Sequence, residues 1–598
     1  MTSVGKREIS LNDLSKSQVR KLIDSMPPET FDRELHLHNL LELIRDADSE
    51  ELLERIALAG YSNRVMELGS KKAKAAGISI DVEDIGLPPR SHEFLIGLIV
   101  EHGGGGNQSV TYQELVRRFA QVHDAYILNE IALFASGVNT LQTLTIQTSL
   151  LHRELTAGRF RETEQLIPAA RRSYRPFDEE MTKSLGFTID EALHVVGFFV
   201  TCLERSIRQQ LDRLEIAKQF HALDLNEDEC RHIPQMANSS RLRQTAEFVD
   251  KLYSHHSELD LYWFTPSHVI TTLPGDITSE QFLNVLSALR VKVGDTSSIP
   301  KGPFSRPVDG PNPIDVRPLV ELNGRVLPAS GDAMLRSLAE TFYHRIFTEM
   351  SRTGRKKEFG RRWGKILEEW TADILETVFP QESIIVGASY KNGETDFLIE
   401  VEESLLVVEC KSKKLPLETR EGDLDVLQYH VEEGIGNALS QAERTIRRLQ
   451  RHGELMVTSA DGSTRMLYAD DYSRYHPIIV TRDFYDNIAT ADYSELLAKL
   501  SVHPLIVDVF NLEMVADIFD TPEAFHQYVT DRRRVAVDQS YYSMDEADYI
   551  GLYLKNNRSF PPIDTEGPLQ INDKSDLVRG RLSDDFGVEI ETAWSKYR

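Results

Sequence analysis

The stretch "TDFLIEVEESLLVVECK", residues 395–411, gives the strongest indication of how this chain folds. Two apolar runs flank Glu402 and Glu403, which predicts a β-hairpin with those two acids as its turn. The second run, "LLVV" (405–408), is apolar at every position, as in a strand that is covered on both faces. It ends in Glu409-Cys410-Lys411, and charged side chains are costly to bury unless they are paired or bind a metal.

The turn also predicts which residues of the hairpin face one another. A two-residue turn pairs Val401 with Ser404 and, further along, Asp396 with Glu409. Directly opposite residues have β-carbons about 5 Å apart on one face, and Lys411, two residues beyond Glu409, points the same way. A slip of one residue would break this arrangement. In this register, Asp396, Glu409 and Lys411 are expected together.

These residue types suit one kind of chemistry. Paired carboxylates are ligands for a hard divalent cation such as Mg²⁺, with Mn²⁺ as a substitute. The metal polarises a phosphate oxygen and lowers the pKa of a bound water, and a lysine beside it offsets the charge of the transition state. The pattern therefore predicts metal-dependent hydrolysis of phosphodiester bonds.

The arrangement resembles the PD-(D/E)xK nuclease superfamily, which has the restriction-endonuclease-like fold. That family has an Asp on one strand and (Asp/Glu)-x-Lys on the next, here Asp396 and Glu409-Cys410-Lys411. One departure is that no Pro precedes Asp396. The resemblance runs from Arg361 to His452 and implies a central mixed sheet flanked by helices. It also implies a nuclease, with DNA favoured over RNA and endonuclease action favoured.

The resemblance implies two more site residues. The family usually adds a Glu on a preceding helix, and "WGKILEEWTADIL" (363–375) supplies Glu368 as a third metal ligand beside Asp396 and Glu409. Glu369 is the alternative, because both acids flank the apolar stripe of the predicted helix. Many members carry a Gln on the helix after the lysine strand, and Gln441 in "SQAERTIRRL" (440–449) fits.

Basic residues gather in sequence around these positions. Lysines and arginines at such places suit contact with a phosphate backbone, which positions nucleic acid without reading its sequence. A solvated charged surface is the alternative interpretation. The nucleic-acid-binding residues predicted here are Arg355, Lys356, Lys357, Arg361, Arg362, Lys413, Lys414, Arg444 and Arg448.

We expect a multidomain chain with a mainly α-helical N-terminal region, an α/β restriction-endonuclease-like domain and a small α-rich C-terminal region. Residues 1–295 read as a helical recognition, regulatory or assembly region, through which the chain forms a homo-oligomer or binds a partner protein. Residues 296–329 are a Pro/Gly-rich linker with a short hairpin at Asn323-Gly324. Residues 330–512 form the nuclease domain, reading helices, strands, helix, strand, strand. Residues 513–598 are a helical extension and tail.

Composition bounds the setting. The net charge of −26 argues against a protein coated in nucleic acid, although a local basic channel is compatible with it. Three cysteines (Cys202, Cys230 and Cys410) are too few for a disulfide framework. The first residues lack the apolar core of a secretory signal, and no apolar run reaches the length of a membrane span. A cytoplasmic protein without membrane contact is expected.

The leading hypothesis is a Mg²⁺-dependent nuclease, with DNA as its partner, in a bacterial anti-phage or restriction-type effector. The last part is an analogy of architecture. The alternative is a catalytically silent nuclease-like fold that binds nucleic acid or acts as a scaffold. A sugar hydrolase fits poorly, because such enzymes need one carboxyl with a raised pKa and a neighbouring cation lowers it.

Overall fold

The computed structural model describes the chain in segments. These belong to two units, and the boundary between the units along the chain lies between Glu349 and Met350. The boundaries predicted at 295, 329 and 512 stay predictions. The described residues are 20–21, 26–27, 30, 32–57, 59, 89–136, 163–200, 263–272, 277–294, 312–414, 429–482, 504–537, 541–543, 546–561 and 569–570.

The first unit is mainly helical in its described residues, as the sequence predicts. Much of its core lies among α2, α4 and α5, where side chains such as Leu40, Ile99 and Phe119 are buried. Its helices are α2 (Arg33–Asp46), α4 (Pro89–His102), α5 (Tyr112–Ala135), α7 (Thr163–Tyr174), α8 (Asp178–Leu185), α12 (Pro266–Thr272), α13 (Ser279–Leu289) and α14 (Pro313–Val316), and α15 (Gly331–Arg352) crosses the unit boundary.

The hairpin predicted at Asn323-Gly324 is confirmed. Strands β2 (Leu319–Leu322) and β3 (Arg325–Pro328) flank a two-residue turn in which both residues have positive φ, 53° and 76°, as a tight hairpin turn requires. A strand that was not predicted, β1 (Arg290–Lys292), pairs in parallel with β2. The first part of the predicted linker, residues 296–311, lies outside the described part of the chain.

The second unit is built on a seven-stranded mixed sheet with the order β10-β9-β6-β5-β4-β7-β8. Strands β6, β9 and β10 are parallel to one another, and the remaining pairs are antiparallel. The bounds are β4 (Ile384–Tyr390), β5 (Gly393–Val401), β6 (Ser404–Lys411), β7 (Glu454–Thr458), β8 (Thr464–Tyr468), β9 (Arg474–Thr481) and β10 (Leu505–Asp508).

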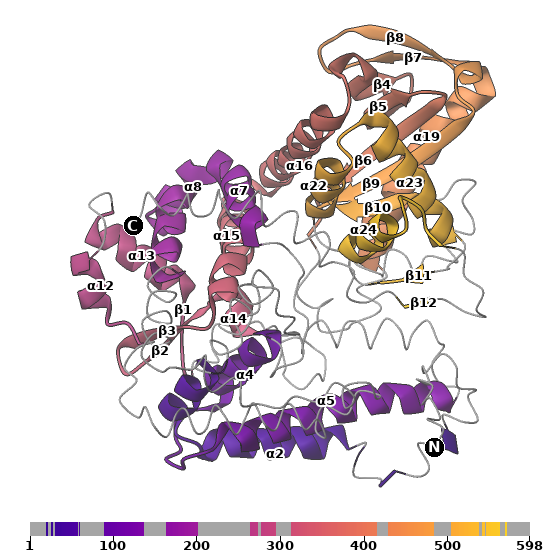
Figure 1. Ribbon diagram of the computed structural model, residues 1–598. Coiled ribbons are helices and arrows are strands. Elements are labelled where there is room, and N and C mark those ends of the chain that lie inside the picture. The colour runs from indigo at the N-terminus through magenta and orange to yellow at the C-terminus, as the bar shows by residue number, and fades with distance from the viewer. Residues whose placement is uncertain are drawn as a thin grey trace, which may run out of the picture. The chain divides into compact units, whose positions relative to one another are not determined.

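Helices cover both faces of the inner strands of this sheet (Figure 1). On one face, Leu405 and Val407 of β6 pack with Ile446 of α19 (Asn437–His452). The other face of β6 meets α16 (Lys356–Val378), where Cys410 Sγ lies 3.4 Å from Thr371 Oγ1. The apolar "LLVV" run is therefore an inner strand covered on both faces, as predicted.

Three further helices follow the last strand, α22 (Val509–Ile518), α23 (Pro522–Val537) and α24 (Glu546–Lys555). A buried ion pair between Arg532 and Glu546 joins α24 to α23. A short pair, β11 (Tyr541–Tyr542) and β12 (Leu569–Gln570), accompanies them. Among the residues that the structure describes, no helix is both long and apolar enough to cross a bilayer.

Two details differ from the predicted order of elements. The last strand of the predicted order, β10, is short and ends at Asp508, because the Asp508 side chain accepts hydrogen bonds from the backbone N–H groups of Phe510 and Asn511 and caps α22. The β7–β8 hairpin was not predicted. Its strands bury only Leu455, Val457 and Leu467, and its outer face exposes Met456, Met466 and Tyr468.

Candidate active site

The predicted hairpin carries the site, and its register is confirmed over most of its length. Val401 lies opposite Ser404, and the ladder continues to Phe397 opposite Val408. The turn at Glu402 and Glu403 therefore forms as expected. The ladder brings the ends of β5 and β6 together where the acidic residues begin.

The next predicted pair, Asp396 with Glu409, is not formed as a ladder pair. Asp396 Oδ2 instead accepts a hydrogen bond from the backbone N–H of Cys410 at 2.6 Å. Thr395 takes the place beside Glu409, and its Oγ1 donates to Glu409 Oε1 at 2.7 Å. The Asp396 carboxylate thus points toward the backbone of β6 and does not lie beside the Glu409 side chain as a ladder neighbour.

An irregularity in β4 and β5 explains this difference. Ile385 and Ala388 both belong to the core beneath α19, although residues three apart on a regular strand point to opposite faces. The alternation shifts at Gly387, which has φ of 59° and lies next to the two ladder pairs that bracket Asp396. The predicted register assumed that side chains alternate strictly between the two faces of the sheet, so it missed this shift.

Burial dominates the electrostatics of the two acids. Only 1% of Glu409 is exposed, and burial, followed by the charge of Asp396, raises the pKa of its carboxyl to about 8. Burial also raises the pKa of Asp396, while the Cys410 N–H and the charge of Lys411 oppose that shift. A buried carboxyl whose ionised form is also disfavoured by a neighbouring acid is costly to ionise unless a cation compensates it.

Lys411 and Gln441 meet at the α19 side of β6. Lys411 Nζ donates to Gln441 Oε1 at 2.6 Å and lies 4.0 Å from Glu409 Oε2. Gln441 thus holds the lysine at the end of its strand, beside the buried acid. The structure places Gln441 against Lys411, the residue with which the resemblance groups it.

Glu368 and Glu369 have different surroundings on α16. Although Glu368 is an exposed residue, enclosure of its carboxyl and then the charge of Asp396 raise its pKa, and Lys411 opposes the shift. Glu369 is exposed and pairs with Lys365 at 3.3 Å. Of the two, Glu368 is therefore the acid that is influenced by the charges of both Asp396 and Lys411.

Sequence reasoning missed two neighbours of the site on β5. The Thr395 hydroxyl bonds Glu409, and the charge of Glu394 raises the pKa of Glu368, Asp396 and Glu409. Glu394 was detectable, since it lies two residues before Asp396 in "GETDF". The role of Thr395 was not detectable, because it depends on the shifted alternation.

A metal at this position would rest on two carboxylates. Within the described part of the chain, no group of three or more His, Cys, Asp or Glu side chains is arranged to hold a metal ion. Mg²⁺ is nevertheless commonly bound by one or two carboxylates, with water and substrate phosphate completing its shell. Asp396 and Glu409 are oxygen ligands of that type and fit such an ion, while Glu368 as a third ligand stays a prediction.

The predicted basic residues occupy two helices beside the site. On α16, Lys357 and Arg361 are exposed and lie at helical spacing on the side that leads to Glu368. On α19, Arg444 and Arg448 follow Gln441 at the same kind of spacing, and the Arg448 guanidinium lies 5.5 Å from the Tyr390 ring centroid.

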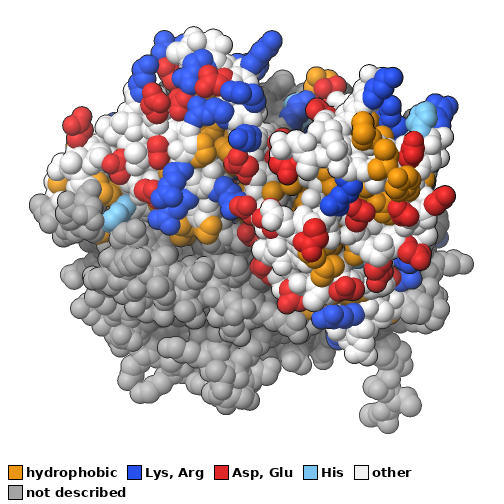
Figure 2. All heavy atoms as spheres, turned by 90° about the horizontal axis from the view of Figure 1, so that it is seen from above, with side chains coloured by type: hydrophobic (Ala, Val, Ile, Leu, Met, Phe, Trp, Pro, Cys, Tyr) orange, Lys and Arg blue, Asp and Glu red, His pale blue; other side chains and the backbone are white. Residues whose placement is uncertain are grey.

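The remaining predicted contacts are partly engaged within the chain. Arg355 and Arg362 both bond Glu358, and Lys413 Nζ lies 5.1 Å from the ring of Tyr429. Lys356 is exposed and Lys414 is half-buried after the end of β6. Basic and acidic side chains are interspersed on the face seen in Figure 2. The basic stripes formed by Lys357 and Arg361 on α16 and by Arg444 and Arg448 on α19 are the better candidates for binding phosphates.

Comparison with models of protein families, with curated proteins and with solved structures finds no match.

Proposed function

We propose that this chain is a Mg²⁺-dependent nuclease that hydrolyses phosphodiester bonds in nucleic acid, with DNA preferred over RNA. The proposal includes the restriction-endonuclease-like fold for the second unit. One observation carries it: Asp396 bonds the Cys410 N–H next to the buried Glu409, its charge acts on that acid, and Lys411 is held beside Glu409 by Gln441.

The buried acids support the metal part of this proposal. Glu409 has a raised pKa because it is buried near Asp396, and a divalent cation would offset both effects. Asp396 and Glu409 would hold Mg²⁺, which supplies Lewis-acid polarisation of the phosphate and a more acidic bound water.

The other side chains supply position and charge. The Lys411 ammonium, fixed by Gln441, is placed to hold the attacking water and to offset charge on the phosphate. Glu368 lies within the electrostatic reach of Asp396 and Lys411 and is placed to accept a hydrogen bond from a water at the site. The stripes on α16 and α19 would contact the backbone phosphates on either side.

A cleavage assay tests the reaction. Plasmid, linear duplex, single-stranded DNA and RNA are incubated with the full chain in Mg²⁺ or EDTA. We expect Mg²⁺-dependent cutting of DNA, and a loss of about 10²-fold or more in Lys411→Ala and Asp396→Asn. Variants that stay folded and cut like the wild type would refute the assignment, and metal-independent binding without cutting would favour the silent nuclease-like fold.

Thermal unfolding tests the metal site without reference to activity. At a Mg²⁺ concentration tenfold above its Kd, the wild type gains about 1.4 kcal/mol of stability. Glu409→Gln, which removes one ligand, is expected to gain much less. Glu400→Gln is the control, because Glu400 lies on the same hairpin but bonds Arg465 and Tyr472. Equal Mg²⁺ shifts in the wild type and Glu409→Gln would argue against the site.

The biological role stays a prediction. A restriction-type or anti-phage effector, with residues 1–295 serving recognition or oligomerisation, follows only from the resemblance in architecture.

A further inference from the structure

Arg482 stands beside the proposed site at the end of the neighbouring strand. Thr481, the last residue of β9, pairs in parallel with Lys411, and the backbone N–H of Arg482 donates to the Lys411 carbonyl oxygen at 3.2 Å. Parallel strands present their carboxyl ends at one edge of a sheet, which is where open α/β sheets bind ligands. The backbones of Lys411 and Arg482 therefore lie side by side at this edge, with the Arg482 guanidinium on the α16 side of the sheet.

The guanidinium of Arg482 is oriented by two buried tryptophans of α16. Its Cζ lies 4.1 Å from the ring centroid of Trp363 and 5.9 Å from that of Trp370. The two rings are two helical turns apart, so the guanidinium lies beside the part of α16 that carries Gly364 and Glu368. A guanidinium stacked on an aromatic ring by its face keeps its N–H donors at its edge.

Gly364 brings α16 close to the end of β6. A β-carbon at Gly364 would lie 3.6 Å from Ser412 Oγ and 4.0 Å from Glu368 Oε1. The hydroxyl that follows Lys411 and the carboxylate of Glu368 thus border the same glycine. Arg482 stacks on Trp363, the residue before Gly364, so Arg482, Ser412 and Glu368 all lie along the same two turns of α16.

We propose that Arg482 and Ser412 bind a backbone phosphate of the substrate strand next to the phosphate that is hydrolysed. The proposal rests on the proposed nuclease function. A guanidinium fork matches two phosphate oxygens at once, and the Ser412 hydroxyl adds a third donor. Because a phosphate contact carries no sequence information, this position orients any strand that enters the site and extends the binding surface from Lys411 toward α16.

The test separates binding from chemistry. Binding of a short DNA duplex is measured by fluorescence anisotropy in Ca²⁺ without Mg²⁺, KM and kcat are measured in Mg²⁺, and thermal unfolding is recorded for every variant. Arg482→Gln is expected to weaken binding and to raise KM about tenfold or more, with a smaller change in kcat. Arg482→Lys, which keeps the charge but loses the fork, should recover part of the affinity, and Ser412→Ala should lose less.

Arg465→Gln is the matched control. Arg465 lies on the edge strand β8 of the same sheet and bonds Glu400 of β5. It should bind and cut like the wild type. If Arg482→Gln only lowers the melting temperature, with unchanged Kd and KM, Arg482 merely joins β9 to α16 and the inference is wrong. If Arg482→Gln does not fold, normal affinity in both Arg482→Lys and Ser412→Ala would be equally decisive.

The outcome also distinguishes this inference from the proposed function. A wild type that cuts DNA, an Asp396→Asn variant that binds but does not cut, and an unaffected Arg482→Gln would reject only the phosphate position. A wild type that neither binds nor cuts any nucleic acid would reject both.

Discussion

At the scale of single residues, α16 offers a matched pair of acids. Glu368 is influenced by the charges of Asp396 and Lys411, whereas Glu369 pairs with Lys365 on the exposed side of the helix. The two carboxylates are adjacent in sequence and differ only in what surrounds them. This makes them a direct test of which acid belongs to the site.

We expect Glu368→Gln to reduce the rate of DNA cleavage by about 10²-fold, in the range of a lost general acid–base or positioning group. Glu369→Gln should keep the rate within about twofold, since a surface ion pair contributes little. The measurement is the initial rate of plasmid nicking at saturating Mg²⁺. Equal losses in both variants, or a loss only in Glu369→Gln, would assign the role differently.

At the scale of elements, the irregularity in β4 and β5 positions Asp396. Gly387 has φ of 59°, and a β-carbon there would lie 3.2 Å from the Ala460 β-carbon. Strained backbone at such a position costs about 1 kcal/mol or more when glycine is replaced. The same shift lets the Asp396 carboxylate reach the Cys410 N–H.

Gly387→Ala is therefore expected to destabilise the chain by about 1 kcal/mol and to lower cleavage more than the loss of folded protein explains. Gly453→Ala is the control. Gly453 also has a positive φ, 77°, but nothing within 4 Å of its would-be β-carbon. It should lose similar stability and keep its specific activity. The readouts are urea unfolding and cleavage per folded molecule. Equal specific activities in Gly387→Ala and Gly453→Ala would show that the irregularity does not affect the site.

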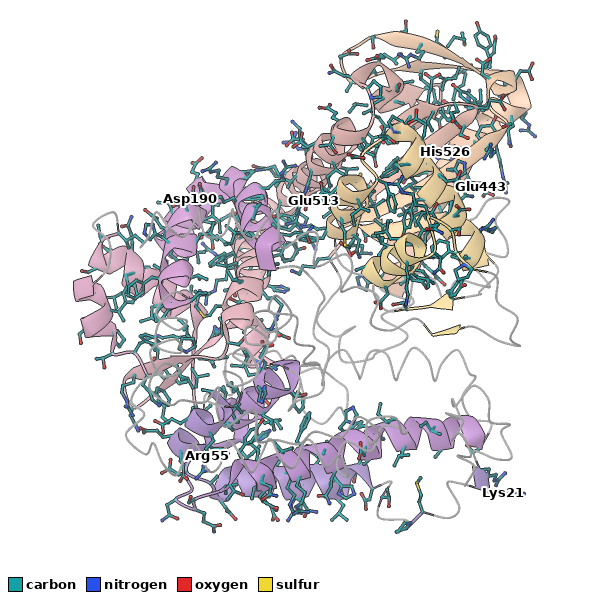
Figure 3. The ribbon with its side chains drawn as sticks, in the orientation of Figure 1. Lys21, Arg55, Asp190, Glu443, Glu513 and His526 are labelled. Atoms are coloured by element: carbon teal, nitrogen blue, oxygen red, sulfur yellow. The ribbon has the colours of Figure 1, made fainter. Side chains whose placement is uncertain are left out.

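A buried histidine pair joins β9 to α23. His476 and His526 face each other with 3.2 Å between their Nε2 atoms, and Figure 3 marks His526 on α23 beside the sheet. Burial and then the charge of Arg533 lower the pKa of His476 to about 3, and Arg474 adds to the shift. Glu402, which lies near His526, acts in the opposite direction on that residue.

A histidine pKa that is lowered by folding makes stability depend on pH in one direction. Above the ordinary value of 6.5 both states are neutral, and below it the unfolded chain binds a proton that folded His476 does not accept. Stability is therefore lost as pH falls from 6.5 toward 3, by about 2 kcal/mol between pH 6.5 and pH 5. His476→Gln should show a smaller loss in denaturant unfolding than the wild type. The exposed control His452→Gln should not differ from the wild type, and an unchanged profile in His476→Gln would refute this account.

At the scale of the whole molecule, an acidic chain presents local basic stripes. The net charge is −26, yet Arg444 and Arg448 follow Gln441 on one side of α19. Affinity for DNA then depends on these few cations and on salt, because each neutralised phosphate releases counterions.

We expect Arg444→Gln with Arg448→Gln to weaken DNA binding at low salt and to flatten the slope of log K against log salt by about 0.9 for each lost phosphate contact. Arg175→Gln, which removes an exposed cation that bonds Asp190 in the first unit, is the control and should leave the slope unchanged. Anisotropy titrations at several salt concentrations give both slopes. A double variant with the wild-type slope would show that Arg444 and Arg448 of α19 do not contact DNA phosphates.

Features that depend on neighbouring residues could be predicted from the amino-acid sequence. The hairpin turn at Glu402 and Glu403, the buried strand before Glu409, and the helices α16 and α19 follow from local apolar patterns, which packing into a core then preserves. The residue types of the candidate site were also visible, because Asp396 and Glu409-Cys410-Lys411 lie on one hairpin.

Tertiary structure alone decided the arrangements that join residues far apart in the chain. The shift at Gly387 turned Asp396 toward the Cys410 N–H, the environment of Glu368 separated it from Glu369, and the pairing of β9 with β6 set Arg482 beside Lys411. The β7–β8 hairpin also joined the sheet through the pairing of Ser389 with Thr458. These outcomes depend on long-range packing and on backbone irregularities, and neither follows from the spacing of residue types along the chain.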